Sequence, residues 1–226
     1  MKIVALTGAG ISAESGIATF RGADGLWEGY KIEEVASPEG WNKNRELVLD
    51  FYNKRRKNVI ESTPNQAHLI LAELEKDHQV QIITQNVDDL HERSGSSNIL
   101  HLHGEITKSR STQYPSLVYS IKGSELNLGD LCEKGAQLRP HIVWFGEVVP
   151  AIDEALGLMT DADYVLVIGT SLQVYPAAGL VDYAPLKAKI VVIDPNSPPV
   201  NLPNVTYLRS GAAEGMRIFK KSLREN

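Results

Sequence analysis

Short apolar segments rich in β-branched residues recur along the chain, separated by segments whose apolar residues are three and four positions apart. The first pattern is typical of buried strands and the second of amphipathic helices. The strands predicted in this way are residues 3–6, 80–84, 99–102, 142–144, 164–168, 190–193 and 205–208, and the helices are 46–60, 64–77 and 212–224. Apolar strands that alternate with helices indicate an α/β fold, in which helices flank a parallel sheet.

Two segments interrupt this alternation. Residues 20–39 are rich in glycine and charge, which predicts a long loop over the carboxyl edge of the sheet. Residues 105–139 mix polar residues with short apolar pieces, which predicts a small inserted module. We therefore expect a single domain over residues 1–226. Its larger part is about 1–29, 62–104 and 140–226, and its small module is about 30–61 and 105–139.

Composition and charge limit the partners that we expect. The net charge of -5 disfavours nucleic acid, which requires clustered Lys and Arg, and suits a cationic, lysine-bearing peptide. The chain starts directly in a strand-like segment and has no apolar run of membrane-spanning length, so we expect neither a signal peptide nor membrane insertion. Cys132 is the only cysteine, which excludes an intrachain disulfide and suits the cytoplasm.

A glycine-rich motif follows the first predicted strand. Its glycines would let backbone amides approach a pyrophosphate at a helix N-terminus, although a tight turn without a ligand remains an alternative. A dehydrogenase would carry an acidic residue at the end of its second strand, about 20 positions on, where this chain has a loop. The motif thus favours a dinucleotide but not hydride transfer. Its residues are Gly8, Ala9, Gly10, Ile11, Ser12 and Ala13.

Polar residues follow other predicted strands. Ligands of open α/β sheets bind at the carboxyl ends of the strands, so these residues are candidates for a binding site. Loop capping is the alternative for Asn and Asp. The candidates are Gln85, Asn86 and Asp88 after strand 80–84, Gly169, Thr170 and Ser171 after strand 164–168, and Asp194 and Asn196 after strand 190–193.

Two histidines are candidates for a general base, because imidazole titrates near neutrality. His101 and His103 are two positions apart on a predicted strand and so share a face. This spacing does not choose between them. We expect His68, His78 and His91 to be surface or helix-packing residues.

The predicted helix 46–60 carries a possible carboxylate site. Tyr52 and Arg55 are three positions apart, so they project from one helical face. A phenol and a guanidinium can together bind a carboxylate. The alternative is a solvated basic face, because Lys54, Arg56 and Lys57 are neighbours.

Taken together, a series of motifs over nearly the whole chain resembles the sirtuins, and most closely bacterial sirtuins of the desuccinylase-like class (class III). The motifs are Gly8-Ala9-Gly10-Ile11-Ser12, Thr19-Phe20-Arg21, Gln85-Asn86-Val87-Asp88, His101-Leu102-His103-Gly104, Trp144-Phe145-Gly146-Glu147 and Gly169-Thr170-Ser171. The resemblance implies a Rossmann-like fold and an enzyme that consumes NAD as a co-substrate. Sirtuins remove acyl groups from protein lysines and release nicotinamide and O-acyl-ADP-ribose.

The resemblance also assigns roles to residues. It makes His103 the general base, with Asn86 and Asp88 holding the nicotinamide end of NAD and Gln85 the ribose. Phe20, Arg21 and Trp27 lie in the segment that covers the nicotinamide side, where Thr19 stands in place of the usual Asp. The other expected NAD contacts are Gly8, Ala9, Gly10, Ser12, Ala13, Gly169, Thr170, Ser171, Asp194, Asn196, Ala212 and Ala213.

For the acylated protein substrate, the resemblance implies two sets of contacts. Tyr52 and Arg55 match the Tyr-x-x-Arg signature of sirtuins that remove succinyl and malonyl groups. A second segment resembles the one that pairs with the substrate peptide as an added strand. Its residues are Val143, Phe145, Gly146 and Glu147.

The chain departs from most sirtuins in its small module, which usually binds zinc through four cysteines. With Cys132 alone we expect no zinc, and a module held by apolar packing of residues such as Val118, Leu126, Leu128 and Leu131. Three functions remain open: a deacylase active on succinyl, malonyl and acetyl groups, an ADP-ribosyltransferase or NAD hydrolase on the same fold, and a non-catalytic NAD sensor.

Overall fold

A parallel six-stranded sheet forms the larger part of the protein in a computed structural model that describes residues 1–19 and 27–225. The strand order is β3-β2-β1-β7-β8-β9, and every neighbouring pair is parallel. The order reverses between β1 and β7, which is where ligands bind in sheets of this kind. The strands are β1 (Lys2–Thr7), β2 (Gln79–Thr84), β3 (Ile99–His101), β7 (Tyr164–Ile168), β8 (Lys189–Ile193) and β9 (Val205–Leu208). The predicted fold class is confirmed.

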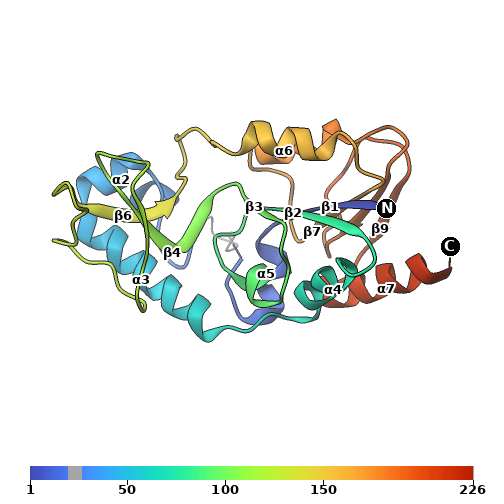
Figure 1. Cartoon of the computed structure of the whole chain (residues 1–226), viewed down its shortest axis with the longest axis horizontal. Helices are drawn as coiled ribbons and strands as arrows, with labels where there is room; N and C mark the ends of the chain where they lie inside the picture. Colours follow the sequence, from blue (N-terminus) through green and yellow to red (C-terminus); the bar gives the residue numbers. More distant parts are fainter. Residues whose placement is uncertain (20–26, 226) are drawn as a thin grey trace.

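Helices cover both faces of this sheet, because alternate strand residues point to opposite sides. In β1, Ile3 and Ala5 belong to one apolar cluster and Val4 and Leu6 to another. The helices are α4 (Gln66–Leu74), α5 (Leu90–Arg93), α6 (Ile152–Met159), η3 (Ala177–Tyr183) and α7 (Ala212–Glu225). Figure 1 shows α6 on one side of the strands and α4, α5 and α7 on the other.

A smaller sheet forms the other end of the molecule, with the strand order β5-β4-β6 and antiparallel pairing. Its strands are β4 (Gly104–Ser111), β5 (Val118–Ser120) and β6 (Leu138–Ile142), and its helices are α1 (Ile32–Val35), α2 (Pro38–Lys43) and α3 (Arg45–Glu61). Figure 1 shows α2, α3, β4 and β6 together at the end opposite α7. Phe51, Tyr52 and Trp144 lie in the apolar cluster that joins these elements.

Several predictions of local structure were wrong. Only Ile142 of the predicted strand 142–144 lies in a strand, at the end of β6 in the small sheet. Val143 and Trp144 lie outside it, because the chain turns after Trp144, where Glu147 donates its amide to the Trp144 carbonyl and Gly146 has a φ of +88°. The segment 20–39, predicted as loop, contains α1 and the start of α2. Ser37 caps α2 by accepting a bond from the Gly40 amide, with Pro38 in the first turn. The short helices α5 and α6 were also missed.

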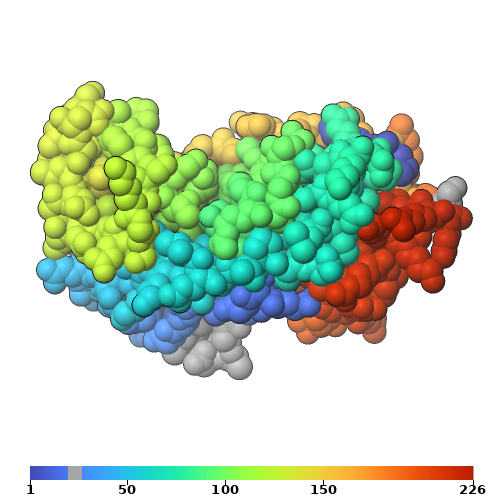
Figure 2. Space-filling view, turned by 60° about the horizontal axis from the view of Figure 1, so that its bottom comes forward, coloured from blue at the N-terminus to red at the C-terminus, as the bar shows by residue number. Residues whose placement is uncertain are grey.

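The glycine-rich loop does not open an α-helix. Two single-turn 3-10 helices follow β1 instead, η1 (Ala9–Ile11) and η2 (Ala13–Ser15), and Gly16 ends the second in the left-handed conformation at φ +85°. The expectation of a helix N-terminus beside a pyrophosphate is therefore wrong. Figure 2 shows this segment in blue, between the cyan region around α3 and the red C-terminal region.

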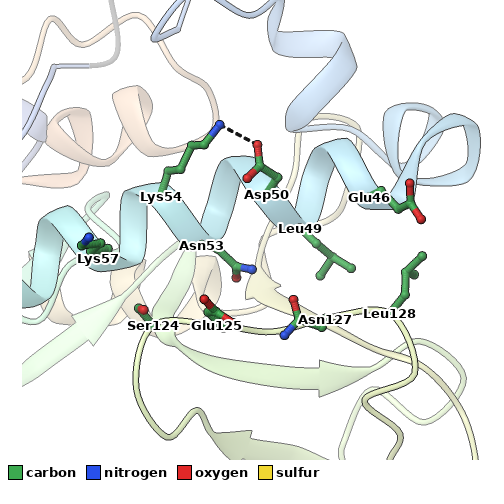
Figure 3. A pocket seen from close by; sticks show the side chains of 10 residues that line it. All are labelled: Glu46, Leu49, Asp50, Asn53, Lys54, Lys57, Ser124, Glu125, Asn127 and Leu128. Atoms are coloured by element: carbon green, nitrogen blue, oxygen red, sulfur yellow. Dashed lines mark ion pairs between the residues drawn. The ribbon is translucent and has the colours of Figure 1, made fainter.

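A buried arginine joins the elements of the small module. The Arg56 side chain is fully buried and donates to the carbonyl oxygens of Ile106 (2.6 Å) and Ser124 (2.9 Å) and to Asn53 Oδ1 (2.7 Å). Asn53 in turn exchanges two hydrogen bonds with the backbone of Leu126. Burial lowers the pKa of Arg56 to about 10, so the guanidinium stays charged at neutral pH. Figure 3 shows Asn53 on α3 beside the loop that carries Ser124.

Only part of the apolar packing expected for the module is present, where Ile121 packs against the apolar cluster of this end of the molecule. Leu126 is buried, but Val118, Leu128 and Leu131 are exposed. Cys132 is buried and donates to Ser111 Oγ at 3.4 Å. Among the residues that the structure describes, no three metal-binding side chains cluster. The polar bonds of Arg56 therefore add to the apolar packing at this end of the molecule.

Replacing Arg56 with methionine is expected to lower the free energy of unfolding by about 3 kcal/mol, because the carbonyls of Ile106 and Ser124 would lose a charged donor in a buried site. Urea denaturation measures the change. The exposed neighbour Lys57 supplies the control, since Lys57→Met is expected to change stability by less than about 0.5 kcal/mol. Equal losses in the two variants would show that Arg56 does not hold the module.

No helix in residues 1–19 and 27–225 is long and apolar enough to cross a membrane.

Candidate active site

A cavity of about 670 Å³ lies at the carboxyl edge of the large sheet and is closed on one side by α3 and the segment after β6. Its size is within the range of small-molecule sites. The predicted site residues that line it are Gly8, Ala9, Gly10, Ser12, Ala13, Trp27, Tyr52, Arg55, Gln85, Asn86, Asp88, His103, Val143, Phe145, Gly146, Glu147, Gly169, Thr170, Ser171, Asp194 and Asn196.

Four predicted residues are not among these. Ala212 and Ala213 are buried at the start of α7, and Gly211 lies at the cavity wall in their place. Phe20 and Arg21 lie outside the described residues.

Glycines allow the ends of β1 and β7 to touch. Gly10 donates its amide to the Gly169 carbonyl at 2.8 Å, and Gly169 is left-handed at φ +60°. A Cβ on Gly8 would lie 2.7 Å from the Thr170 Cβ, and one on Gly10 would lie 2.6 Å from the Gly169 Cα. Larger residues are therefore excluded, and the cavity wall is backbone at the point where the strand order reverses. Such a wall fits the pyrophosphate and ribose of a dinucleotide.

A buried hydrogen-bond network fixes the amide and carboxylate that follow β2. Ser12 Oγ accepts from Asn86 Nδ2 (3.1 Å) and donates to Asp88 Oδ2 (3.0 Å). His68 Nδ1 accepts the Asn65 amide, so its Nε2 carries the proton and donates to Ser12 Oγ at 3.4 Å. Burial raises the pKa of the Asp88 carboxyl, which the bond from Ser12 partly offsets. Asn86 and Asp88 thus have fixed orientations at the cavity wall.

Of the two roles expected for His68 and His91, surface or helix packing, the structure shows helix packing, because the two side chains meet between α4 and α5. His68 and His91 are fully buried below the cavity, and their rings are 4.9 Å apart. His91 Nε2 lies 3.1 Å from Thr7 Oγ1, which itself donates to Thr84 Oγ1. Burial lowers the pKa of His68 to about 4 and that of His91 well below its ordinary value, so both rings are neutral. The sequence signal for His68 was its position three residues after Asn65, the spacing of a capping box at the start of α4.

The structure separates the two candidate bases. His101 donates from Nδ1 to the Asn86 carbonyl, and its Nε2 lies 2.7 Å from Glu92 Oε1. Burial lowers the pKa of His101, but Glu92 and the Asn86 carbonyl, with the charge of Glu105, together outweigh burial and the net shift is upward. Both ring nitrogens of His101 are therefore occupied, and its charged form is favoured.

His103 has the opposite environment. Its Nδ1 lies 3.0 Å from the Gln85 carbonyl, which can only accept, so Nδ1 carries the proton and Nε2 keeps its lone pair. Burial lowers the pKa of His103, and the bond to Gln85 only partly offsets this. Gly104 follows in the left-handed conformation, where a Cβ would lie 2.0 Å from the His141 carbonyl oxygen. His103 is thus a neutral acceptor at the cavity, held where the chain passes between the two sheets.

The module side of the cavity carries a phenol and a guanidinium. Tyr52 is 1% exposed, and its oxygen accepts a bond from Trp144 Nε1 at 3.0 Å. Burial raises the pKa of the Tyr52 phenol above its ordinary value, so the hydroxyl keeps its proton and can donate. Arg55 is 7% exposed, which excludes the solvated basic face for this residue, and its guanidinium lies 4.2 Å from the Trp27 ring centroid. Trp144 was not predicted as a site residue.

The segment after β6 is fixed by the rest of the protein. Val143 donates its amide to the His103 carbonyl (2.9 Å), and Phe145 donates to the Ala36 carbonyl (3.0 Å). An added peptide strand would therefore need other main-chain groups of this segment. Glu147 accepts from Arg139 at 2.8 and 2.9 Å, from Arg110, and from the Trp144 amide. The Glu147 carboxylate thus stabilises the turn that follows Trp144.

The fold and this site define an α/β protein that binds a dinucleotide at the carboxyl edge of its parallel sheet. The chain belongs to the Sir2 family, whose model matches residues 8–176. An NAD-dependent protein deacylase of Helicobacter pylori is 58% identical over 99% of this chain and 98% of its own length. One of Bacteroides thetaiotaomicron is 51% identical over 98% and 97%.

Solved structures agree with this assignment. A Sir2 homolog in complex with NAD superposes with a TM-score of 0.89 at 41% identity, over 99% of this chain and 90% of the other. A Sir2 variant with a deacetylated p53 peptide and 3′-O-acetyl ADP-ribose superposes with a TM-score of 0.83 at 31% identity, over 97% and 92%.

Proposed function

We propose that this protein is an NAD-dependent protein-lysine deacylase that releases nicotinamide and O-acyl-ADP-ribose. The observation that carries the proposal is that one cavity brings together a glycine-lined wall, the fixed pair Asn86 and Asp88, and a neutral His103. The names of the relatives from H. pylori and B. thetaiotaomicron support it. A cytoplasmic location belongs to the same proposal, since the single Cys132 suits a reducing compartment.

NAD supplies the reactive ribose carbon and the nicotinamide leaving group when it is bound. In our proposal, the side chains of Asn86 and Asp88 bind the nicotinamide amide, and Gln85 binds the ribose. His103 Nε2 accepts a proton from a ribose hydroxyl. The backbone of Gly8 and Gly10 would lie against the pyrophosphate, and Asp194 and Asn196 against the adenosine ribose. The enclosed cavity would keep water from the reacting carbon.

We propose that Tyr52 and Arg55 select acyl groups that end in a carboxylate, such as succinyl and malonyl, while acetyl is also accepted. Trp144 uses a lone pair of the Tyr52 oxygen, which leaves the phenolic hydrogen to donate. Arg55 adds a charged donor to the same wall of the cavity. Together they would form charge-assisted hydrogen bonds to the acyl carboxylate.

The alternatives on this fold differ in their products. With a succinyl-lysine peptide and NAD, a deacylase forms O-succinyl-ADP-ribose and free lysine, and mass spectrometry detects both. Free ADP-ribose with an unchanged peptide would support an NAD hydrolase, and ADP-ribose attached to protein would support an ADP-ribosyltransferase. Binding of NAD without nicotinamide release with any acyl peptide would support a sensor.

The pH dependence of kcat/KM is expected to identify the base. His103 must be neutral to accept a proton, and burial lowers its pKa from the ordinary 6.5. Activity should therefore be at its plateau at pH 7 and fall about tenfold per pH unit below the His103 pKa. His101, whose pKa is raised, would place this fall above pH 6.5. A rate profile measured between pH 5 and 8, about the His range, distinguishes the two.

A further inference from the structure

The acyl-reading arginine already has a carboxylate partner. Arg55 Nη1 lies 2.7 Å from Glu28 Oε1, and the Arg55 side chain is 7% exposed against 33% for Glu28. Burial lowers the pKa of the Arg55 guanidinium, and the charge of Glu28 is the largest effect that opposes this lowering. The buried cation is therefore balanced by an anion that reaches solvent.

The Glu28 carboxylate is positioned by a tight turn of the backbone. Trp27 and Tyr30 exchange two backbone hydrogen bonds of 2.9 and 3.0 Å around Glu28 and Gly29. Both central residues are left-handed, at φ +50° and +84°. Such turns favour Asn, Asp or Gly at the first position, because a longer side chain is strained there. The local backbone gives no reason for glutamate, whereas the ion pair with Arg55 does.

Arg55 also has a hydrogen-bond donor to spare. Its buried Nε has no partner among the described residues, and Arg55 lines the cavity whereas Glu28 does not. Glu28 thus approaches the guanidinium from outside the cavity wall. A ligand carboxylate inside the cavity would be a second anion on the same guanidinium, in competition with Glu28 for its charge.

We propose that Glu28 is the resident counter-ion of Arg55 and sets the acyl selectivity of the enzyme. This inference rests on the proposed function of Arg55 as reader of acyl carboxylates. When the acyl group is neutral, as in acetyl-lysine, Glu28 balances the buried charge of Arg55, so the acetyl group can bind beside it. When the acyl group carries a carboxylate, Glu28 competes with that carboxylate for Arg55 and so weakens the binding of the acyl group. Glu28 is a positioning residue that acts through Arg55 without touching the substrate.

Steady-state kinetics of the full chain with matched succinyl-lysine and acetyl-lysine peptides test the inference. Glu28→Gln is expected to lower KM for the succinyl peptide about threefold to tenfold and to raise KM for the acetyl peptide, with kcat unchanged for both. Glu28→Gly, which suits the left-handed turn, should give the same split between KM and kcat. The exposed Glu34 on α1 supplies the control, and Glu34→Gln should change neither KM.

The double variant Arg55→Met with Glu28→Gln distinguishes the carboxylate-binding role of Arg55 from the counter-ion role of Glu28. If Glu28 acts through Arg55, adding Glu28→Gln to Arg55→Met changes neither KM. If the native selectivity depends on Arg55 but both Glu28 variants keep the native ratio of succinyl to acetyl activity, the counter-ion role is wrong and the carboxylate reader stands. If Arg55→Met itself leaves the ratio unchanged, the proposed reader is wrong, and the counter-ion role with it.

Discussion

Replacing His103 with alanine is expected to lower nicotinamide release with an acyl-lysine peptide by about 100-fold to 10,000-fold, the usual contribution of a general base. The reason is the hydrogen bond from His103 Nδ1 to the Gln85 carbonyl, which leaves Nε2 unprotonated at the cavity. Release of nicotinamide can be followed by chromatography under saturating NAD.

His101 is the matched comparison for this variant. Its two ring nitrogens are engaged by the Asn86 carbonyl and by Glu92, so it has no free lone pair to offer. His101→Ala should lower the rate less than about tenfold, through the loss of one support for the loop. A larger loss in His101→Ala than in His103→Ala would reverse the assignment of the base.

Replacing Arg55 with methionine is expected to lower kcat/KM for a succinyl-lysine peptide by about 30-fold or more, because a buried charged donor to a carboxylate contributes at least about 2 kcal/mol. Activity on acetyl-lysine should change less than about threefold, since methionine fills a similar volume. The native preference for succinyl would then be lost.

Two controls accompany this variant. Lys54 is exposed on the same helix and pairs with Asp50, so Lys54→Met should leave both activities unchanged. Arg55→Lys keeps the charge but loses the planar fork, and it should retain an intermediate preference. If Arg55→Met reduced both activities equally, Arg55 would have a structural role and would not read the acyl group.

The large sheet could be predicted because its strands are buried on both faces and so appear as continuous apolar runs. The short helices could not be predicted from the sequence. Helices α1 and α5 span four residues each, too few to show a period, although Ser37 and Pro38 signalled the start of α2. The strand β6 was misplaced because the end of an antiparallel strand depends on its partner β4 and on the turn that Glu147 stabilises.

Residues after the strands could be placed near one another because parallel strands end at one edge of the sheet. Burial could not be predicted in the same way. Arg55 and Arg56 are buried whereas Lys54 and Lys57 are exposed, on a helix where all four look alike in sequence. His68 and His91 meet only because α4 and α5 pack together. The ion pair between Glu28 and Arg55 joins segments that no sequence pattern connects.

The central claim is that NAD is consumed in order to remove an acyl group from lysine. The most direct measurement is the amount of nicotinamide and of free lysine formed by the native protein from NAD, with and without a succinyl-lysine peptide. Deacylation predicts equal amounts of both products with the peptide and almost no nicotinamide without it. Nicotinamide release that is independent of the peptide, with no lysine set free, would contradict the account.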